Sequence, residues 1–181
     1  MTERKRVENF PRDLIIYLGG KMTIQIGEKI PSITLSTMTS EGPKPIVLDE
    51  LCAGKKVVLF AVPGAFTPTC SVQHLPGYIN NAAALKEKGV DVIACISVND
   101  PFVMGAWGEE RNVGEEVLML ADGNGDFTSA VGLELDGTGF GLGTRSQRYA
   151  MVIDSGVVSV LNVEPGPSLE VSAAERILES L

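Results

Sequence analysis

The stretch 57–71 (VVLFAVPGAFTPTCS) constrains the fold of this chain more than any other segment. It opens with an unbroken apolar run at 57–62, rich in β-branched residues, which predicts a strand buried on both faces. The Pro-Gly pair at 63–64 ends that strand. Thr67 followed by Pro68 then predicts the start of a helix, with a hydroxyl at the cap and proline at the first helical position.

Cys70 is the third residue of this predicted helix and so lies in its first turn. The backbone N–H groups of a first turn lack partners within the helix, and the helix dipole is positive there. A thiol in this position is biased toward the thiolate, which is its nucleophilic form. A buried structural cysteine is the alternative interpretation, but the position directly after a strand and a Pro-Gly break favours a reactive nucleophile.

Composition and charge narrow the class of protein. The chain has 181 residues, which suits one domain, and its formal net charge of −8 argues against nucleic acid or an anionic membrane as a partner. Three cysteines and a single histidine are too few for a usual zinc site. The odd cysteine count favours a reducing, cytoplasmic location over a secreted disulfide framework. No apolar run approaches the length of a membrane span.

The beginning of the chain needs a separate interpretation. Residues 1–21 combine a basic run, Arg4-Lys5-Arg6, with a short apolar run at 14–18. That apolar run is shorter than the one in a signal peptide, and no clear cleavage site follows it. We expect residues 1–21 to be a disordered extension, or upstream sequence before a physiological start at Met22. The domain is therefore predicted to span residues 22–181.

The remaining pattern predicts an α/β sheet with a parallel part and an antiparallel edge. The predicted strands are 33–36, 57–62, 90–98, 117–120, 147–153 and 157–162, with a hairpin turn at 154–156. The predicted helices are 67–88 (interrupted at Pro76-Gly77), one that starts at 101, 126–131 and 168–181. The stretches 42–45 and 137–143 are predicted to be loops because of their glycine and proline content.

Two of these helices carry more specific predictions. Asp100 is expected to cap the helix that starts at 101. The apolar face of that helix is expected to consist of Phe102, Val103, Ala106 and Trp107. Ser168 is expected to cap the C-terminal helix, whose apolar stripe is expected to consist of Leu169, Ala173, Ile177 and Leu181.

A helix start alone does not account for a thiolate at Cys70. Lowering a thiol pKa by roughly 2–3 units takes about 3–4 kcal/mol, whereas a helix N-terminus supplies about 0.3–2 kcal/mol. Arg148 is the best candidate for the missing cation. It shares a face of its predicted strand with Ala150 and Val152, where a guanidinium needs an anionic partner. An arginine that reaches water at the strand end is the alternative, and Arg145 in the preceding loop has the weaker claim.

Two neighbours of Cys70 could take part in its chemistry. The Thr67 hydroxyl can reach the Cys70 N–H or its sulfur, although a role as helix cap is a sufficient explanation. His74 lies one helical turn after Cys70 and could act as a base. A lone histidine beside Pro76 is better explained as a packing residue. Cys52 has no special neighbours and is interpreted as a packing or loop thiol.

These residues belong to a pattern that resembles a known family. Residues 63–70 (PGAFTPTC) are similar to the Pro-x-x-x-Thr-x-x-Cys active-site motif of the peroxiredoxins. The continuation through 71–77, the segment 97–107 and Arg148 resemble the atypical type II branch, the peroxiredoxin-five subfamily. The resemblance extends from Met22 to the C-terminus.

The resemblance implies a thioredoxin fold with peroxiredoxin-type insertions, in which a mixed central sheet is flanked by helices. It implies a homodimeric thiol-dependent peroxidase of antioxidant defence that reduces hydrogen peroxide and organic hydroperoxides without a metal or organic cofactor. Cys70 would be the peroxidatic nucleophile, which is oxidised to sulfenic acid. Thr67 would hydrogen-bond the sulfur and the peroxide, Pro63 would shield the sulfenate from water, and Arg148 would stabilise the thiolate and the transition state.

The resemblance leaves two recycling routes open. Animal members of this branch carry a resolving cysteine near the C-terminus, and residues 161–181 contain none. Cys95 occupies the position of a second cysteine in plant and many bacterial relatives, but it lies among apolar residues of a predicted strand and is expected to be buried. The other route is an external thiol, either glutathione with glutaredoxin or thioredoxin. It is favoured because it would reach an exposed sulfenate directly.

Two other functional classes are alternatives to a peroxidase. A thioredoxin-like thiol–disulfide oxidoreductase needs a Cys-x-x-Cys motif, and this chain has Thr-Pro-Thr-Cys at 67–70. A redox-regulated chaperone or binding protein could keep the fold without the activity. An assay of peroxide consumption separates all three classes.

Overall fold

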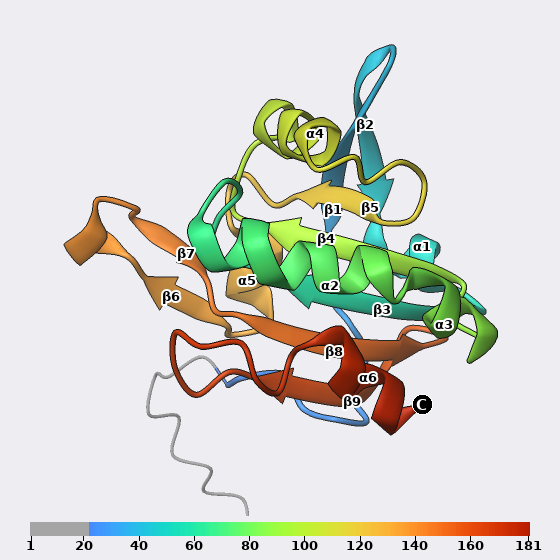
Figure 1. Ribbon diagram of the computed structural model, residues 1–181. Coiled ribbons are helices and arrows are strands. Elements are labelled where there is room, and N and C mark those ends of the chain that lie inside the picture. The colour runs from blue at the N-terminus through green and yellow to red at the C-terminus, as the bar shows by residue number, and fades with distance from the viewer. Residues whose placement is uncertain (1–21) are drawn as a thin grey trace, which may run out of the picture.

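The computed structural model describes residues 22–181, so the expectation for residues 1–21 lies outside the described part of the chain. A seven-stranded sheet in the order β2-β1-β5-β4-β3-β8-β9 forms its centre (Figure 1). The strands of this sheet are β1 (Thr34–Thr39), β2 (Gly42–Val47), β3 (Lys56–Ala61), β4 (Val92–Ser97), β5 (Leu118–Ala121), β8 (Tyr149–Asp154) and β9 (Val157–Val163). A separate pair, β6 (Glu134–Asp136) and β7 (Thr144–Ser146), forms an arm at one end of the sheet (Figure 1).

The helical elements connect these strands. They are α1 (Leu48–Cys52), the π-helical turn η1 (Cys70–His74), α2 (Leu75–Asn80), α3 (Ala82–Glu87), α4 (Pro101–Glu110), α5 (Asp126–Ala130), the 3-10 turn η2 (Thr138–Phe140) and α6 (Ala174–Ser180). None of the helices within residues 22–181 is both long and apolar enough to cross a membrane.

The sheet is mixed, as the sequence predicts. β3 pairs with β4, and β4 with β5, in parallel. β8 pairs antiparallel with both β3 and β9, and β1 pairs antiparallel with both β5 and β2. The predicted hairpin joins β8 to β9 through Ser155 and Gly156, which both have positive φ angles as this tight turn requires.

The strand that was predicted to be buried on both faces lies between two hydrophobic cores, one on each side of the sheet. Every residue from Val57 to Val62 is fully buried. Val58, Phe60 and Val62 face the core that is covered by α2, α3, α4 and α6. Their neighbours at 57, 59 and 61 face the core that is covered by α1 and α5. Cys70 belongs to the first of these cores.

The prediction of a loop at 42–45 is wrong, because Gly42–Val47 forms the strand β2 at the edge of the sheet. Pro43 lies opposite Met38 of β1, and Pro45 lies opposite Ser36. An edge strand tolerates proline because one row of its backbone groups needs no ladder partner. The prolines that were interpreted as a sign of a loop are instead typical of a strand at the edge of the sheet.

The predicted apolar face of α4 is also wrong in part. The helix starts at Pro101, and the Asp100 carboxylate accepts a hydrogen bond from the Val103 N–H, as a cap does. Met104, Trp107 and Gly108 are the buried residues, whereas Phe102 is 64% exposed. The helix is apolar around much of its circumference, so the spacing of its apolar residues does not predict which face is buried. The buried face is the one that packs against the sheet.

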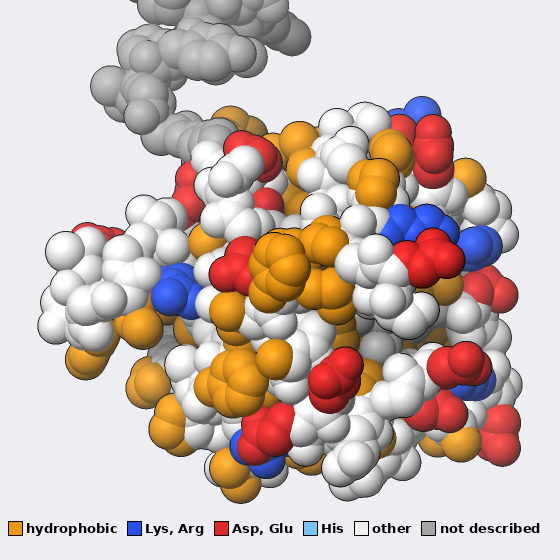
Figure 2. All heavy atoms as spheres, turned by 90° about the horizontal axis from the view of Figure 1, so that it is seen from above, with side chains coloured by type: hydrophobic (Ala, Val, Ile, Leu, Met, Phe, Trp, Pro, Cys, Tyr) orange, Lys and Arg blue, Asp and Glu red, His pale blue; other side chains and the backbone are white. Residues whose placement is uncertain are grey.

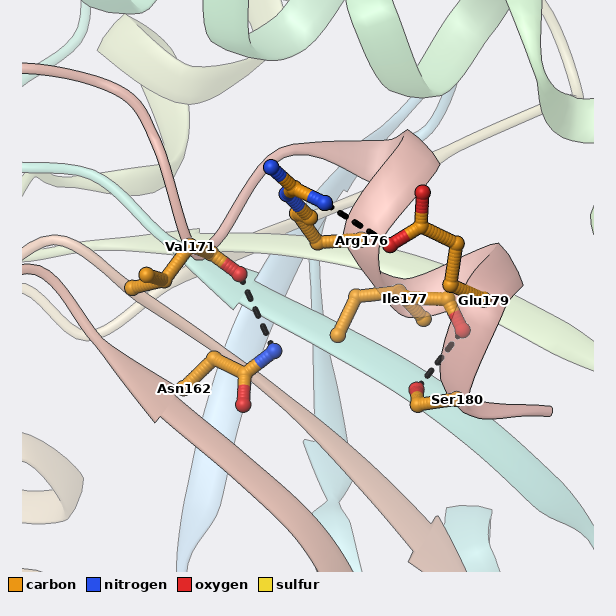
Figure 3. A network of polar contacts seen from close by, with 6 residues as sticks. All are labelled: Asn162, Val171, Arg176, Ile177, Glu179 and Ser180. Atoms are coloured by element: carbon orange, nitrogen blue, oxygen red, sulfur yellow. Dashed lines mark hydrogen bonds and ion pairs between the residues drawn. The ribbon is translucent and has the colours of Figure 1, made fainter.

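The C-terminal helix begins later than predicted, at Ala174 instead of near Ser168. The Glu164 carboxylate accepts hydrogen bonds from the backbone N–H groups of Glu170 and Ser172. The side chain of Asn162 also donates to the Val171 carbonyl (Figure 3). These bonds hold residues 170–172 against the end of β9, in place of the first turn of a helix.

The other predicted elements are present with modest shifts at their ends. The sequence analysis did not predict α1 or the β6–β7 pair, which are short elements. The predicted loop at 137–143 contains the single turn η2 and otherwise has no regular structure.

Candidate active site

The loop after β3 carries the helix start that the sequence predicts. The first helical residue is Pro68, and Cys70 is the third. From Cys70 the helix widens into the π-helical turn η1, in which the Leu75 N–H donates to the Cys70 carbonyl five residues earlier. Pro76 has no N–H, and in an α-helix its ring would collide with a carbonyl of the preceding turn. The wide turn lets the helix continue through this proline.

The predicted interruption at Pro76-Gly77 is therefore displaced. The helix is irregular one turn earlier, at Cys70–His74, and it breaks again at Asn81 between α2 and α3. Both Cys70 and His74 are buried members of the wide turn. The turn thus determines how these two side chains lie relative to each other.

Bonds to the end of β4 hold the loop that precedes Cys70. The side-chain oxygen of Asn99 accepts from the Ala65 N–H at 3.0 Å and from the Ser97 hydroxyl at 2.8 Å. Phe66 has a φ of 63°, a left-handed conformation that costs a non-glycine residue about 1–2 kcal/mol. The loop bonds offset this cost. Pro63, half-buried, lies in the same loop just after β3.

Thr67 does not cap the helix in the way that the sequence predicts. Its hydroxyl donates to the Gly64 carbonyl at 2.8 Å, and within residues 22–181 it forms no hydrogen bond to Cys70. A side chain at Gly64 would meet Thr67 Cγ2 and Arg145 Nη1, each at 3.2 Å. Because position 64 has no side chain, Thr67 and Arg145 can both lie close to the backbone of Gly64.

Arg148 lies beside the sulfur of Cys70. Its Nη1 donates to Cys70 Sγ at 3.4 Å, and both side chains are buried. The next residue, Tyr149, pairs with Ala61 at the end of β3, so β8 delivers Arg148 to the loop that carries the cysteine. The structure thus brings together the thiol and the cation that the sequence analysis paired.

The guanidinium of Arg148 has an unusual set of neighbours. Within residues 22–181 no carboxylate lies within ion-pair distance of it. Its Nε–H is buried and has no hydrogen-bond partner among the described residues. A buried cation of this kind needs a negative charge nearby, and Cys70 Sγ is the contacting atom that can carry one.

His74 contacts the same guanidinium. Arg148 Nη1 donates to His74 Nδ1 at 3.2 Å, so Nδ1 carries no proton. The opposite nitrogen, Nε2, therefore carries the proton and donates to the Ser172 carbonyl at 3.1 Å. The Tyr78 hydroxyl donates to the same carbonyl at 2.8 Å.

The environment of His74 excludes a role as a base at neutral pH. Burial, followed by the positive charge of Arg148, lowers the pKa of His74 from its usual value to about 3. The ring packs against Phe60 and Tyr78, with centroids 5.0 Å and 5.6 Å away. The packing interpretation therefore holds. The ring also contacts Arg148, which the sequence did not indicate except through the one-turn spacing between His74 and Cys70.

The other candidate residues lie apart from the sulfur. Arg145 donates to the carbonyls of Leu142 and Val98, and so ties the β6–β7 arm to the end of β4. Cys52 is buried at the end of α1, where burial and the nearby Asp49 raise its pKa to about 11. All three cysteines are free.

Cys95 lies in the middle of the sheet. It is opposite Phe60 of β3 and Met119 of β5, and it shares the first core with Cys70. Burial raises the pKa of the Cys95 thiol, and the nearby Cys70 raises it further. The expectation that Cys95 is buried holds.

Three comparisons relate this chain to known proteins. The family model Redoxin matches residues 25–178. "Peroxiredoxin-2E, chloroplastic" of Arabidopsis thaliana is 51% identical over 163 residues, which is 88% of this chain and 70% of that protein. "Peroxiredoxin-2D" of the same plant is 48% identical over 159 residues, which is 87% of this chain and 98% of that protein.

Solved structures are similar over the same region. Reduced Prx3 in complex with H2O2 from Vibrio vulnificus is 62% identical, with a TM-score of 0.84, over 87% of this chain and 99% of that one. Peroxiredoxin 5 from Alvinella pompejana is 37% identical, with a TM-score of 0.76, over 87% of this chain and 97% of that one.

We expect the imidazole of His74 to stay neutral between pH 8 and 5, because its pKa of about 3 lies below that range. The unfolded chain binds this proton near pH 6.5 and the folded chain does not. The stabilisation from the neutral ring is therefore complete above pH 6.5, and about 1.4 kcal/mol is lost per pH unit as the pH falls below it.

NMR of the ring checks the first expectation directly, because the chain contains only one histidine. Urea unfolding at pH 7 and pH 5.5 checks the second, with a His74→Gln variant that lacks the titrating group as the control. A ring that titrates near pH 6 in the folded chain would contradict both expectations.

Proposed function

Starting from the premise that this chain belongs to the redoxin family and is a peroxiredoxin, we propose that Cys70 is the residue that attacks the peroxide. The comparisons confirm the predicted family, the thioredoxin-like mixed α/β fold and the class of enzyme, a thiol-dependent peroxidase of antioxidant defence. The similarity to a peroxiredoxin 5 structure is consistent with the predicted type II branch.

The proposed reaction transfers one oxygen atom to sulfur. The Cys70 thiolate attacks one peroxide oxygen, an S–O bond forms, and the O–O bond breaks. The departing oxygen takes up a proton and leaves as water from hydrogen peroxide, or as an alcohol from an organic hydroperoxide. The sulfur is oxidised to sulfenic acid and the peroxide is reduced by two electrons. Hydrogen peroxide is the first substrate to test, because the related Prx3 was solved in complex with it.

The contact between Arg148 and Cys70 carries this proposal. A guanidinium 3.4 Å from the sulfur, buried and without a carboxylate partner in residues 22–181, favours the thiolate over the neutral thiol. The same group can stabilise negative charge on the departing oxygen. Its partnerless Nε–H provides a donor that a peroxide oxygen could accept from.

Two further residues of the loop have proposed roles. The Thr67 hydroxyl donates its proton to Gly64, so its oxygen is an acceptor for the O–H of a peroxide. Pro63 has no N–H and is half-buried beside the site, which suits the shielding role that the resemblance implies. Neither role requires a metal or an organic cofactor.

The burial of Cys70 affects how its sulfenic acid can be recycled. Cys70 is fully buried in the reduced chain, so an external thiol has no direct access to the sulfur in this state. Attack on a sulfenic acid at this position therefore requires the first turns of the helix to open, whichever thiol attacks. Cys95 is held in β4 by strands on both sides, so it is the less mobile partner. We propose an external thiol, either glutathione with glutaredoxin or thioredoxin.

Exposed aromatic residues near the site support a homodimer. Phe66 and Phe102 are exposed where the loop after β3 meets the start of α4. Phe140 is exposed on the β6–β7 arm, which Arg145 ties to the end of β4. Figure 2 looks onto the α4 side and shows hydrophobic side chains gathered between the charged ones. We propose that this surface forms the contact. A cytoplasmic location stays a prediction.

We expect Cys70→Ser to abolish peroxide consumption while the chain remains folded, because the hydroxyl is a far weaker nucleophile than a thiolate. Loss of hydrogen peroxide in the presence of a thiol reductant measures the activity, and circular dichroism checks the fold. Cys52→Ala is the matched control and should keep its activity, since Cys52 lies in the other core. Turnover by Cys70→Ser would exclude Cys70 as the nucleophile.

For the recycling step, we expect one equivalent of hydrogen peroxide followed by glutathione to give a mixed disulfide at Cys70. Mass spectrometry under non-reducing conditions identifies the product. A Cys95→Ala variant should retain full turnover with glutaredoxin and glutathione. A stoichiometric disulfide between Cys70 and Cys95 would show instead that the internal route operates.

We expect light scattering to give twice the chain mass for the unmodified protein and the monomer mass for Phe102→Glu. The carboxylate would be buried without a partner in the proposed contact. Ile26→Glu is the matched control, because Ile26 is equally exposed but lies outside this surface. A monomeric unmodified chain, or a dimeric Phe102→Glu variant, would refute the proposed surface.

A further inference from the structure

A carboxylate at the end of β9 fixes the segment that leads into α6. Glu164 Oε1 accepts three hydrogen bonds, each 2.8 Å long, from the Glu170 N–H, the Ser172 N–H and the Ser172 hydroxyl. Its other oxygen, Oε2, is buried and has no partner among residues 22–181. All the side-chain hydrogen bonds of this buried carboxylate therefore go to one short segment, residues 170–172.

The same segment has a second attachment on its exposed side. Figure 3 shows the Asn162 side chain reaching from β9 to the Val171 carbonyl, a bond of 3.0 Å. Farther along α6, Arg176 pairs with Glu179 on the surface, away from this attachment (Figure 3). Asn162 holds the outside of the segment, whereas Glu164 holds the buried residue Ser172.

Ser172 connects this attachment to the active site. Its carbonyl accepts from His74 Nε2 at 3.1 Å and from the Tyr78 hydroxyl at 2.8 Å. His74 Nδ1 in turn accepts from Arg148 Nη1, the same atom that donates to Cys70 Sγ. A continuous chain of contacts thus runs from the Glu164 carboxylate to the sulfur.

A backbone bond closes this chain into a ring. The Glu164 N–H donates to the Arg148 carbonyl at 2.9 Å. Glu164 therefore contacts the backbone of Arg148 directly and reaches its guanidinium through Ser172 and His74. Burial raises the pKa of Glu164, but hydrogen bonds from Ser172 and Glu170 outweigh this effect and lower its pKa below the usual value. The carboxylate is ionised at neutral pH.

We propose that Glu164 is a positioning residue of the peroxidase. Its carboxylate fixes Ser172, the Ser172 carbonyl sets the proton position and orientation of the His74 ring, and the ring directs Arg148 toward Cys70. Glu164 touches neither the sulfur nor a substrate and acts only through these neighbours. The effect on the reaction rests on the proposed function, in which Cys70 is the nucleophile. The effect on the His74 ring does not.

The test uses the full chain with Glu164→Ala. We expect the rate constant for oxidation of Cys70 by hydrogen peroxide to fall by about 10- to 100-fold, because a misplacement of roughly an ångström at the reacting groups can cost about 100-fold. We also expect NMR of the only imidazole to show a ring that exchanges between its two neutral tautomers, instead of one fixed Nε2–H form. Glu164→Gln keeps one acceptor oxygen, so its rate constant and its ring signal should lie between those of the unmodified chain and those of Glu164→Ala.

Controls separate positioning from a general loss of structure. Glu179→Gln removes a carboxylate from the surface of α6 and should leave both measurements unchanged. In a His74→Gln background, Glu164→Ala should cost less than about twofold, because the connection to Arg148 is already broken. An equal loss in both backgrounds would overturn the proposal.

Two further results would also overturn it: an unchanged rate in Glu164→Ala, or a reduced rate with an unchanged His74 ring signal. If Glu164→Ala does not fold, Glu164→Gln decides by the same two measurements, and wild-type values for both overturn the proposal. Failure of the proposed function has a different signature, since the unmodified chain would then form no sulfenic acid at Cys70. The ring signal tests the positioning in that case as well.

Discussion

The rest of the site depends on a buried positive charge that lies next to a sulfur atom. Taking a guanidinium out of water without an anionic partner is costly, and Arg148 is only 8% exposed. Its side-chain contacts are a neutral ring nitrogen of His74 and the sulfur of Cys70. Of these two, only the sulfur can become negative. The stability of the buried arginine and the reactivity of the cysteine are therefore two aspects of one interaction.

The order of the strands makes this contact possible. Parallel pairing places the ends of β3 and β4 at the same edge of the sheet, where Asn99 holds the loop that carries the cysteine. Antiparallel pairing of β8 with β3 brings the start of β8 to that same edge. Arg148 precedes that start by one residue, so the register between Tyr149 and Ala61 fixes its distance from the loop.

Three other parts of the chain support the wide helical turn. Trp107 of α4 donates to the Ser71 hydroxyl at 3.0 Å, and Arg148 and Ser172 contact the two nitrogens of His74. A π-helical turn is rare, and such turns are frequently found at functional sites. Here Pro76 makes a regular turn costly, and these contacts hold the alternative. The geometry around Cys70 therefore depends on α4, β8 and the C-terminal segment together.

The sequence by itself determined the strand at 57–62 and the helix start at Pro68, because local periodicity and proline chemistry can be read from neighbouring residues. It made Arg148 the best candidate partner of Cys70, because a buried charge needs a partner, but it left open an arginine that reaches water. It did not determine the buried face of α4, the edge strand with Pro43 and Pro45, or the late start of α6. Nor did it indicate Ser172, which lies 98 residues from the His74 ring that it contacts, or Glu164, which holds Ser172 in place. Those features are decided by contacts between distant segments, which exist only once the sheet has assembled and which no local pattern encodes.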